Sequence, residues 1–151
     1  MNIFYCDEQD EPVDGQAIQD LALHVLTAEH LPTGTEMSII LVDAEQMAGY
    51  NEQFLDRSGP TDVLALPLEH LVPGHPPRRV ANEPPIALGD IFLCPDYITR
   101  RATAERLDPG DYDLPRLVVH GILHLLGYDH HEDDPAVLME QREDELLEGR
   151  S

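Results

Sequence analysis

The histidines of this chain are concentrated near its C-terminal end. Half of the eight lie between residues 120 and 131, within the segment VHGILHLLGYDHH. His120 and His124 are four residues apart, a spacing that places two imidazoles on one face of a helix, one turn apart. Gly127 can take a positive φ, end the helix and reverse the chain, so that His130 returns to the same point. The pattern predicts that these three imidazoles bind one metal ion.

The number and type of these ligands indicate which ion and which chemistry. Three neutral imidazoles leave a fourth tetrahedral position open for water, as in catalytic zinc sites, whereas a structural site is usually closed by a fourth protein ligand. Zinc lowers the pKa of a bound water to about 7 and supplies hydroxide at neutral pH. The predicted site is one Zn²⁺ on His120, His124 and His130, and the predicted chemistry is hydrolysis. His131 is an alternative third ligand at a longer spacing.

The histidine spacing matches the metalloprotease pattern HExxHxxGxxH, with one difference. Gly121 stands where those proteases carry the glutamate that takes a proton from water on the zinc. Glycine has no group for this task, so the pattern indicates zincin-like metal geometry and argues against ordinary peptide hydrolysis. The sequence assigns no general acid or base.

The rest of the chain is predicted to supply four short strands and five helices that position the histidines. Strands are expected at 2–6, 37–42, 63–66 and 87–94, and helices at about 16–29, 44–55, 95–107, 114–126 and 135–147. The helix at 114–126 carries His120 and His124.

Apolar positions three and four residues apart mark the faces that the first and last helices should bury. These positions are Ile18, Leu21, Ala22, Val25 and Leu26 in the first helix and Val137, Leu138, Leu146 and Leu147 in the last. The first two strands are rich in apolar residues, which predicts that they are buried. Five prolines between Pro73 and Pro85 predict an irregular surface loop.

Length and composition predict one domain spanning residues 1–151. No run of eighteen apolar residues and no basic, apolar leader is present, so we expect a soluble protein without a recognisable export signal. Cys6 and Cys94 lie far apart and in no CxxC pair, which favours a reducing cytosol. Both are interpreted as small buried hydrophobes.

The net charge is strongly negative. The chain contains thirty acidic residues and nine basic ones, all of them Arg, which gives a formal net charge of −21. Such a surface repels nucleic acid, so a polyanionic partner must be held locally. The absence of Lys favours salt adaptation, with solvated helix faces from a GC-rich genome as the alternative. Six of the nine arginines lie between residues 78 and 116, and a polyanionic partner, if one binds, is expected to enter from that side.

The segment HGILHLLGYDH resembles the signature of the YbeY-type endoribonucleases, a bacterial family of ribosomal RNA maturation. Three further segments are similar to that family in the same order: 60–64, the strand from Gly89 to Cys94, and Met139 with a downstream Glu before Leu146 and Leu147. The resemblance covers about residues 36 to 147.

This resemblance implies an α+β, zincin-like single domain with a mixed four-stranded sheet and about five helices. It also implies a cytoplasmic, single-strand-specific, zinc-dependent endoribonuclease that acts in 16S 3′-end maturation and ribosome quality control. The implied partners are RNA, in particular rRNA and ribosomal particles, with no membrane and no DNA. Two alternatives stay open: a metallopeptidase or other zinc hydrolase on the same three-His site, and a ribosome-assembly module whose zinc is structural.

One departure from the family concerns phosphate binding. The family has an Arg four residues after the position of Asn51, where this chain has Leu55. Arg57, two residues further on, is the candidate phosphate contact, because a guanidinium can hold a phosphate with two hydrogen bonds. The alternative is a solvated loop charge.

Other residues are candidates for a role beside the metal. Asp62, Asp90 and Asp129 are candidates to orient a ligand histidine, with Asp90 favoured because it interrupts an apolar strand, and the other two equally consistent with turn caps. Met139 is interpreted as core rather than as a residue beneath the metal.

Overall fold

The computed structural model describes residues 1–78, 82–128 and 133–148. Their elements follow in the order β1 (Asn2–Asp7), α1 (Gly15–Ala28), β2 (Thr35–Leu41), α2 (Ala44–Leu55), β3 (Val63–Pro67), β4 (Ile86–Leu93), α3 (Pro95–Ala104), α4 (Leu114–Leu125) and α5 (Asp133–Glu148). The strands form one sheet in the order β1-β2-β4-β3, in which only the β3–β4 pair is antiparallel. The mixed four-stranded sheet with five helices confirms the predicted α+β fold.

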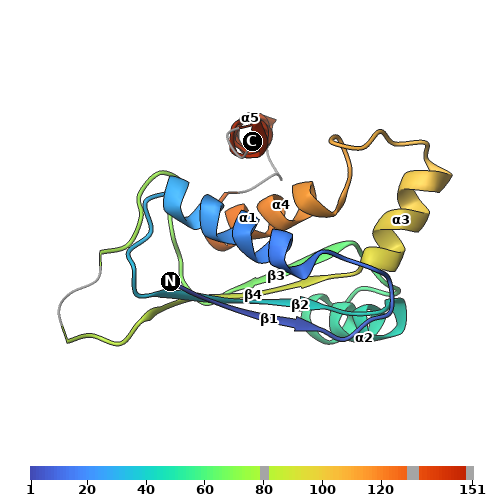
Figure 1. Cartoon of the computed structure of the whole chain (residues 1–151), viewed down its shortest axis with the longest axis horizontal. Coiled ribbons are helices and arrows are strands. Elements are labelled where there is room, and N and C mark those ends of the chain that lie inside the picture. The colour runs from blue at the N-terminus through green and yellow to red at the C-terminus, as the bar shows by residue number, and fades with distance from the viewer. Residues whose placement is uncertain (79–81, 129–132, 149–151) are drawn as a thin grey trace.

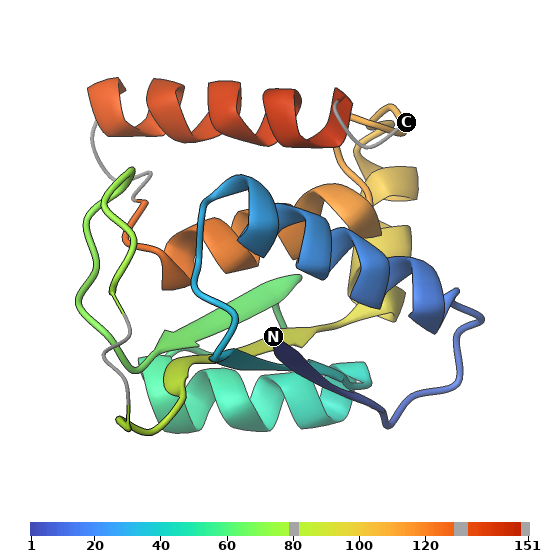
Figure 2. The same ribbon diagram turned by 60° about the vertical axis from the view of Figure 1, so that its left-hand side comes forward.

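The helices lie in layers around the sheet. Helices α1 and α4 cover one face, and α2 lies on the opposite face (Figure 1). Helix α5 packs on α4 and α1 as an outer layer and stands away from the sheet (Figure 2). Helix α4 is therefore enclosed between the sheet and α5, at the centre of the molecule.

Local sequence explains the two helices of the inner layer. Asp14 caps α1 by accepting a hydrogen bond from the backbone N–H of Ala17, and Asp113 caps α4 in the same way through Arg116. All five positions of the predicted α1 stripe are buried. Helix α4 is apolar on most of its surface, which suits a helix with neighbours on two sides.

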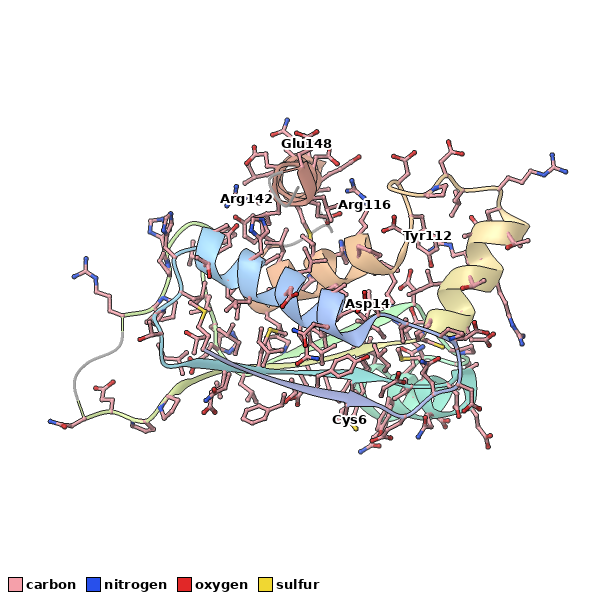
Figure 3. All side chains as sticks on the ribbon, viewed as in Figure 1. Cys6, Asp14, Tyr112, Arg116, Arg142 and Glu148 are labelled. Atoms are coloured by element: carbon pink, nitrogen blue, oxygen red, sulfur yellow. The ribbon has the colours of Figure 1, made fainter. Side chains whose placement is uncertain are left out.

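Strand β1 differs from the prediction of a buried strand. It is the edge strand, and only the face under α1 is covered, so that Phe4 is 56% exposed on the other face. Cys6 shares that uncovered face and is exposed (Figure 3), so the interpretation of Cys6 as buried was wrong. Cys94 is buried as predicted.

The predicted inward face of α5 was right for Leu146, which is buried, and for Leu147, which packs against the core, and wrong for Val137 and Leu138. Val137 and Leu138 are each 54% exposed. Met139 and Glu143 are buried together with Leu146, at four- and three-residue steps along the helix. The true inward face contains a carboxylate, which a search for apolar periodicity passes over. Met139 itself is core, as predicted.

Two further segments bear on the predicted boundaries. Helix α3 ends at Ala104, earlier than expected, and Arg106 just beyond it has a positive φ of 54°. Residues 73–78 and 82–85 contain no helix and no strand apart from one isolated bridge at His75, as the prolines predicted. Among the described helices, none is both long enough and apolar enough to cross a membrane.

Candidate metal centre and cleft

A cleft with a volume of about 580 Å³ opens beside α4. Its walls come from α3, α4 and α5, from β3, from the end of α2 with the loop after it, and from the segment that leads into α4. His120, His124, Glu143, Arg57, Arg101 and Arg116 line it. Two of the three predicted metal ligands are thus in one cleft with three arginines.

His120 and His124 are arranged as the predicted helix spacing requires. Their Nε2 atoms lie 3.1 Å apart, and their ring planes make an angle of 81°. Two imidazole nitrogens on one tetrahedral zinc, each about 2.0–2.1 Å from the ion, are separated by roughly 3.3 Å. The pair therefore fits a shared ion.

The protonation of His120 supports the same fit. Its Nδ1 lies 2.7 Å from Oε2 of Glu143, a carboxylate oxygen that can only accept. In a neutral ring whose Nδ1–H donates to this carboxylate, the lone pair is on Nε2, the nitrogen that lies near His124. A histidine held in this way by a carboxylate is the usual form of a zinc ligand.

The third predicted ligand, His130, and its alternative His131 lie outside the described residues. Within the described part of the chain, no group of three His, Cys, Asp or Glu side chains is placed to hold a metal ion. The described residues accordingly supply two donors of the predicted site, His120 and His124.

The chain reversal after α4 occurs where the sequence predicted it. Gly127 has a φ of 97°, and its N–H donates to the carbonyl of His124. The backbone of Leu71 occupies the place that a Cβ would take at this position. Tyr128 then donates its hydroxyl to Glu29, which is also paired with Arg142. These contacts fix the chain up to the residue before the undescribed segment.

Gly121 has a packing reason to be glycine. A Cβ at this position would lie 3.1 Å from Cγ2 of Val63 and 3.2 Å from Cγ2 of Ile91. Helix α4 thus approaches the sheet closely at the residue where metalloproteases carry their glutamate. A longer side chain here would separate α4 from the sheet.

Two of the cleft arginines are neutralised by carboxylates. Arg101 donates to Asp62 at 3.3 Å and to Glu105 at 2.7 Å. Arg116 pairs with Glu143 and Asp144. Both guanidinium groups therefore have their charge balanced within the protein.

Arg57 differs from them, because its guanidinium makes no hydrogen bond or ion pair with the described residues. The loop that carries it begins at Asp56, which ends α2 in the left-handed conformation with a φ of 52°. Leu55, in the place of the family Arg, lines the cleft beside Arg57 and is 44% exposed.

None of the three aspartates proposed to orient a histidine has that contact in the described residues. Asp62 instead accepts hydrogen bonds from the Tyr112 hydroxyl at 3.0 Å and from the backbone N–H of Val63 at 2.7 Å. Asp90 lies in β4 outside the cleft lining, and Asp129 is outside the described residues. The carboxylate that contacts a predicted ligand histidine is Glu143. The sequence feature that could have indicated it is its place one helical turn after Met139.

Tyr112 forms part of the same wall. Burial raises the pKa of its hydroxyl, the negative charge of Asp62 raises it further, and Arg101 acts in the opposite direction. The guanidinium of Arg101 lies 4.8 Å from the centre of the Tyr112 ring. Tyr112 is therefore held as a proton donor between the cleft and α3.

The mixed sheet, the central helix with its paired imidazoles and the open cleft define an α+β domain with a candidate metal centre. Comparison with known proteins narrows this class. The chain belongs to the endoribonuclease YbeY family, whose model matches residues 4–150. It is by that membership an enzyme, and the resemblance seen in the sequence is confirmed.

Individual relatives cover nearly the whole chain. Endoribonuclease YbeY of Thermobifida fusca is 40% identical over 149 residues, which are 99% of this chain and 94% of the relative. The Streptomyces coelicolor protein of the same name is 41% identical over 141 residues, covering 92% and 84%. The solution structure of TM1509 from Thermotoga maritima, with 24% identity, superimposes with a TM-score of 0.61 over 98% of this chain and 88% of that one. This last likeness shows a shared fold.

Proposed function

We propose that the chain is a cytoplasmic, zinc-dependent endoribonuclease that cleaves single-stranded RNA during 16S 3′-end maturation and in ribosome quality control. Residues 1–151 form its single catalytic domain. The observation that carries the proposal is the pair of Nε2 atoms, 3.1 Å apart, in an open cleft of a protein of this family. When bound, zinc supplies a Lewis acid at this point.

The residues around the cleft have separate tasks in this proposal. His120, His124 and His130 hold the ion. Arg57 binds a phosphate of the RNA, because it is the cleft arginine whose charge is not balanced within the described residues. Arg57 would in this way replace the family Arg, because the side chain of Leu55 at that position cannot donate a hydrogen bond to a phosphate.

The acidic surface determines how RNA is bound. With a net charge of −21, the protein repels RNA everywhere except where positive charge is concentrated. Arg57 and the ion would provide such a place, so we expect few phosphate contacts and modest affinity that weakens with salt. Ribosomal particles are the partners that would present the RNA to this cleft.

A metallopeptidase is disfavoured by the surroundings of Gly121. Glycine offers no base, and a Cβ at this position would lie 3.1 Å from Val63 and 3.2 Å from Ile91, so a glutamate there would need these side chains to shift. RNA cleavage by the neighbouring 2′-hydroxyl does not use an attacking water, so it does not require a water-activating glutamate at this position.

The test uses the purified chain with a labelled single-stranded RNA and, in parallel, labelled casein. Cleavage of RNA should stop in chelator, return with zinc and be lost in His124→Ala. His70→Ala is the matched control, because His70 is exposed and outside the cleft lining, and it should keep activity. A 2′,3′-cyclic phosphate product would indicate 2′-hydroxyl attack, and a 5′-phosphate with a 3′-hydroxyl would indicate water attack. Chelator-insensitive RNA cleavage, or cleavage of casein alone, would refute the proposal.

A further inference from the structure

Glu143 is a buried carboxylate with no role among the proposed metal ligands. Its exposed fraction is 6%, and it lies on α5, a helix that contributes no ligand. Both carboxylate oxygens are engaged by α4: Oε2 accepts from Nδ1 of His120 at 2.7 Å, and Oε1 accepts from Arg116 at 3.2 Å. Figure 3 shows Arg116 between the two helices.

We propose that Glu143 is the positioning residue of the metal centre, and that Arg116 holds its carboxylate in place. The proposal rests on the zinc site proposed above. Glu143 keeps the proton of the His120 ring on Nδ1 and fixes the direction in which the Nε2 lone pair points.

The first argument is the geometry of the imidazole. A neutral ring carries one proton, and only the other nitrogen can bind a cation. If the proton moved to Nε2, or if the ring turned over, His120 would present an N–H to the ion. The short bond to Glu143 prevents both changes, because a carboxylate offers an acceptor and no donor.

The second argument concerns the way in which the carboxylate itself is held. A buried carboxylate is costly unless its oxygens have partners, and here each oxygen has its own. Arg116 is fixed in turn by Asp144 and by the carbonyl oxygen of Gly110, 2.6 Å from its Nε. Gly110 thus holds Arg116, Arg116 holds Glu143, and Glu143 holds the ring of His120. The orientation of this ligand is therefore fixed by contacts from both α4 and α5.

The test is the zinc affinity of the apoprotein, measured by competition with a chromophoric chelator. Glu143→Gln keeps the size of the side chain and removes its charge, and we expect the Kd for zinc to rise about 10- to 100-fold. Glu140→Gln is the matched control, with the same change one turn earlier on an exposed position of α5. Its Kd should stay within about twofold of the parent value.

A second measurement has its decisive result in the wild-type protein, so that result does not depend on the folding of a variant. Long-range ¹H–¹⁵N spectra of the wild-type apoprotein should show His120 protonated at Nδ1. In Glu143→Gln the same spectrum should show a mixture of tautomers. Wild-type protein with His120 protonated at Nε2 would overturn the proposal.

The outcomes separate this proposal from the proposed function. If wild-type protein binds no zinc, the zinc site fails and the positioning role fails with it. If wild-type protein binds zinc and Glu143→Gln binds it equally well, the positioning role is overturned while the zinc site stands. A lower melting temperature of apo Glu143→Gln with an unchanged Kd would likewise overturn it, because Glu143 would then be only an ion pair between helices.

Discussion

The side-chain N–H of Asn51 donates a hydrogen bond of 3.0 Å to the carbonyl oxygen of Gly59. Asn51 is 4% exposed, and its backbone carbonyl also accepts the N–H of Arg57 at 3.3 Å. Asn51 thus holds the loop after α2 at two points, with its side-chain amide at Gly59 and with its backbone carbonyl at Arg57. These contacts hold the loop that places Arg57 on the cleft wall.

Replacing Arg57 should weaken RNA binding. Arg57→Gln removes one charge-assisted phosphate contact, so we expect KM for RNA to rise about tenfold, equivalent to about 1.4 kcal/mol. The slope of log K against log salt should fall by about 1. Arg100→Gln is the control, because the Arg100 side chain is 78% exposed, pairs with Asp96 and lies outside the cleft lining. Equal changes in the two variants would contradict a specific contact at Arg57.

Removing the metal should lower thermal stability. A ligand that binds only the folded state at 100 times its Kd stabilises a protein by about 2.7 kcal/mol, which is roughly 5–10 °C for a chain of this size. Zinc should therefore raise Tm by that amount, and chelator should reverse it. Scanning fluorimetry of His124→Ala should show no zinc-dependent shift. A full shift in that variant would mean that zinc binds elsewhere.

Two glycines should respond in opposite directions to alanine. Gly127→Ala places a Cβ against the backbone of Leu71 at a φ of 97°, so it should lose about 2 kcal/mol or more of unfolding free energy. Gly49→Ala lies in α2, where a Cβ meets nothing within 4 Å, and should gain about 0.5–1 kcal/mol. Urea denaturation of both variants measures the difference. A stable Gly127→Ala would argue against the chain reversal described here.

The two thiols should differ in reactivity. The pKa of both thiols is raised, by the hydrogen bond to Glu8 at Cys6 and by burial at Cys94, so the difference comes from access: Cys6 is exposed and Cys94 is buried. A disulfide reagent should therefore modify one thiol in the native protein and two in guanidinium. Cys6→Ser should abolish the native reaction. Two reactive thiols in the native state would contradict the burial of Cys94.

The elements that follow from local sequence were predictable. The stripe of α1 is buried because five apolar side chains recur with the helical period, and this period needs no knowledge of the neighbours. The same holds for His120 and His124, whose meeting depends only on one turn of helix. Gly127 also signals its turn locally, through the conformation that only glycine adopts easily.

The elements that depend on distant partners were not predictable in the same way. Glu143 belongs on the inward face of α5 only because Arg116 and His120 lie opposite it. Without that knowledge, the apolar Val137 and Leu138 are the natural choice for the buried face, and they are exposed. The prediction that Cys6 is buried failed for a related reason. Its burial depends on whether a further layer covers that face of the edge strand β1.

Stability should fall at alkaline pH in a way that Tyr112 controls. Burial and the charge of Asp62 raise its pKa above the ordinary value of about 10, so the folded state keeps this proton when the unfolded state loses it. The unfolded state then binds fewer protons, and the free energy of unfolding decreases as pH rises above about 10. Tyr112→Phe removes this contribution and should lose less stability between pH 9 and 11 than the parent protein does. Urea denaturation across that range measures it, and identical pH profiles would show that the Tyr112 hydroxyl titrates alike in both states.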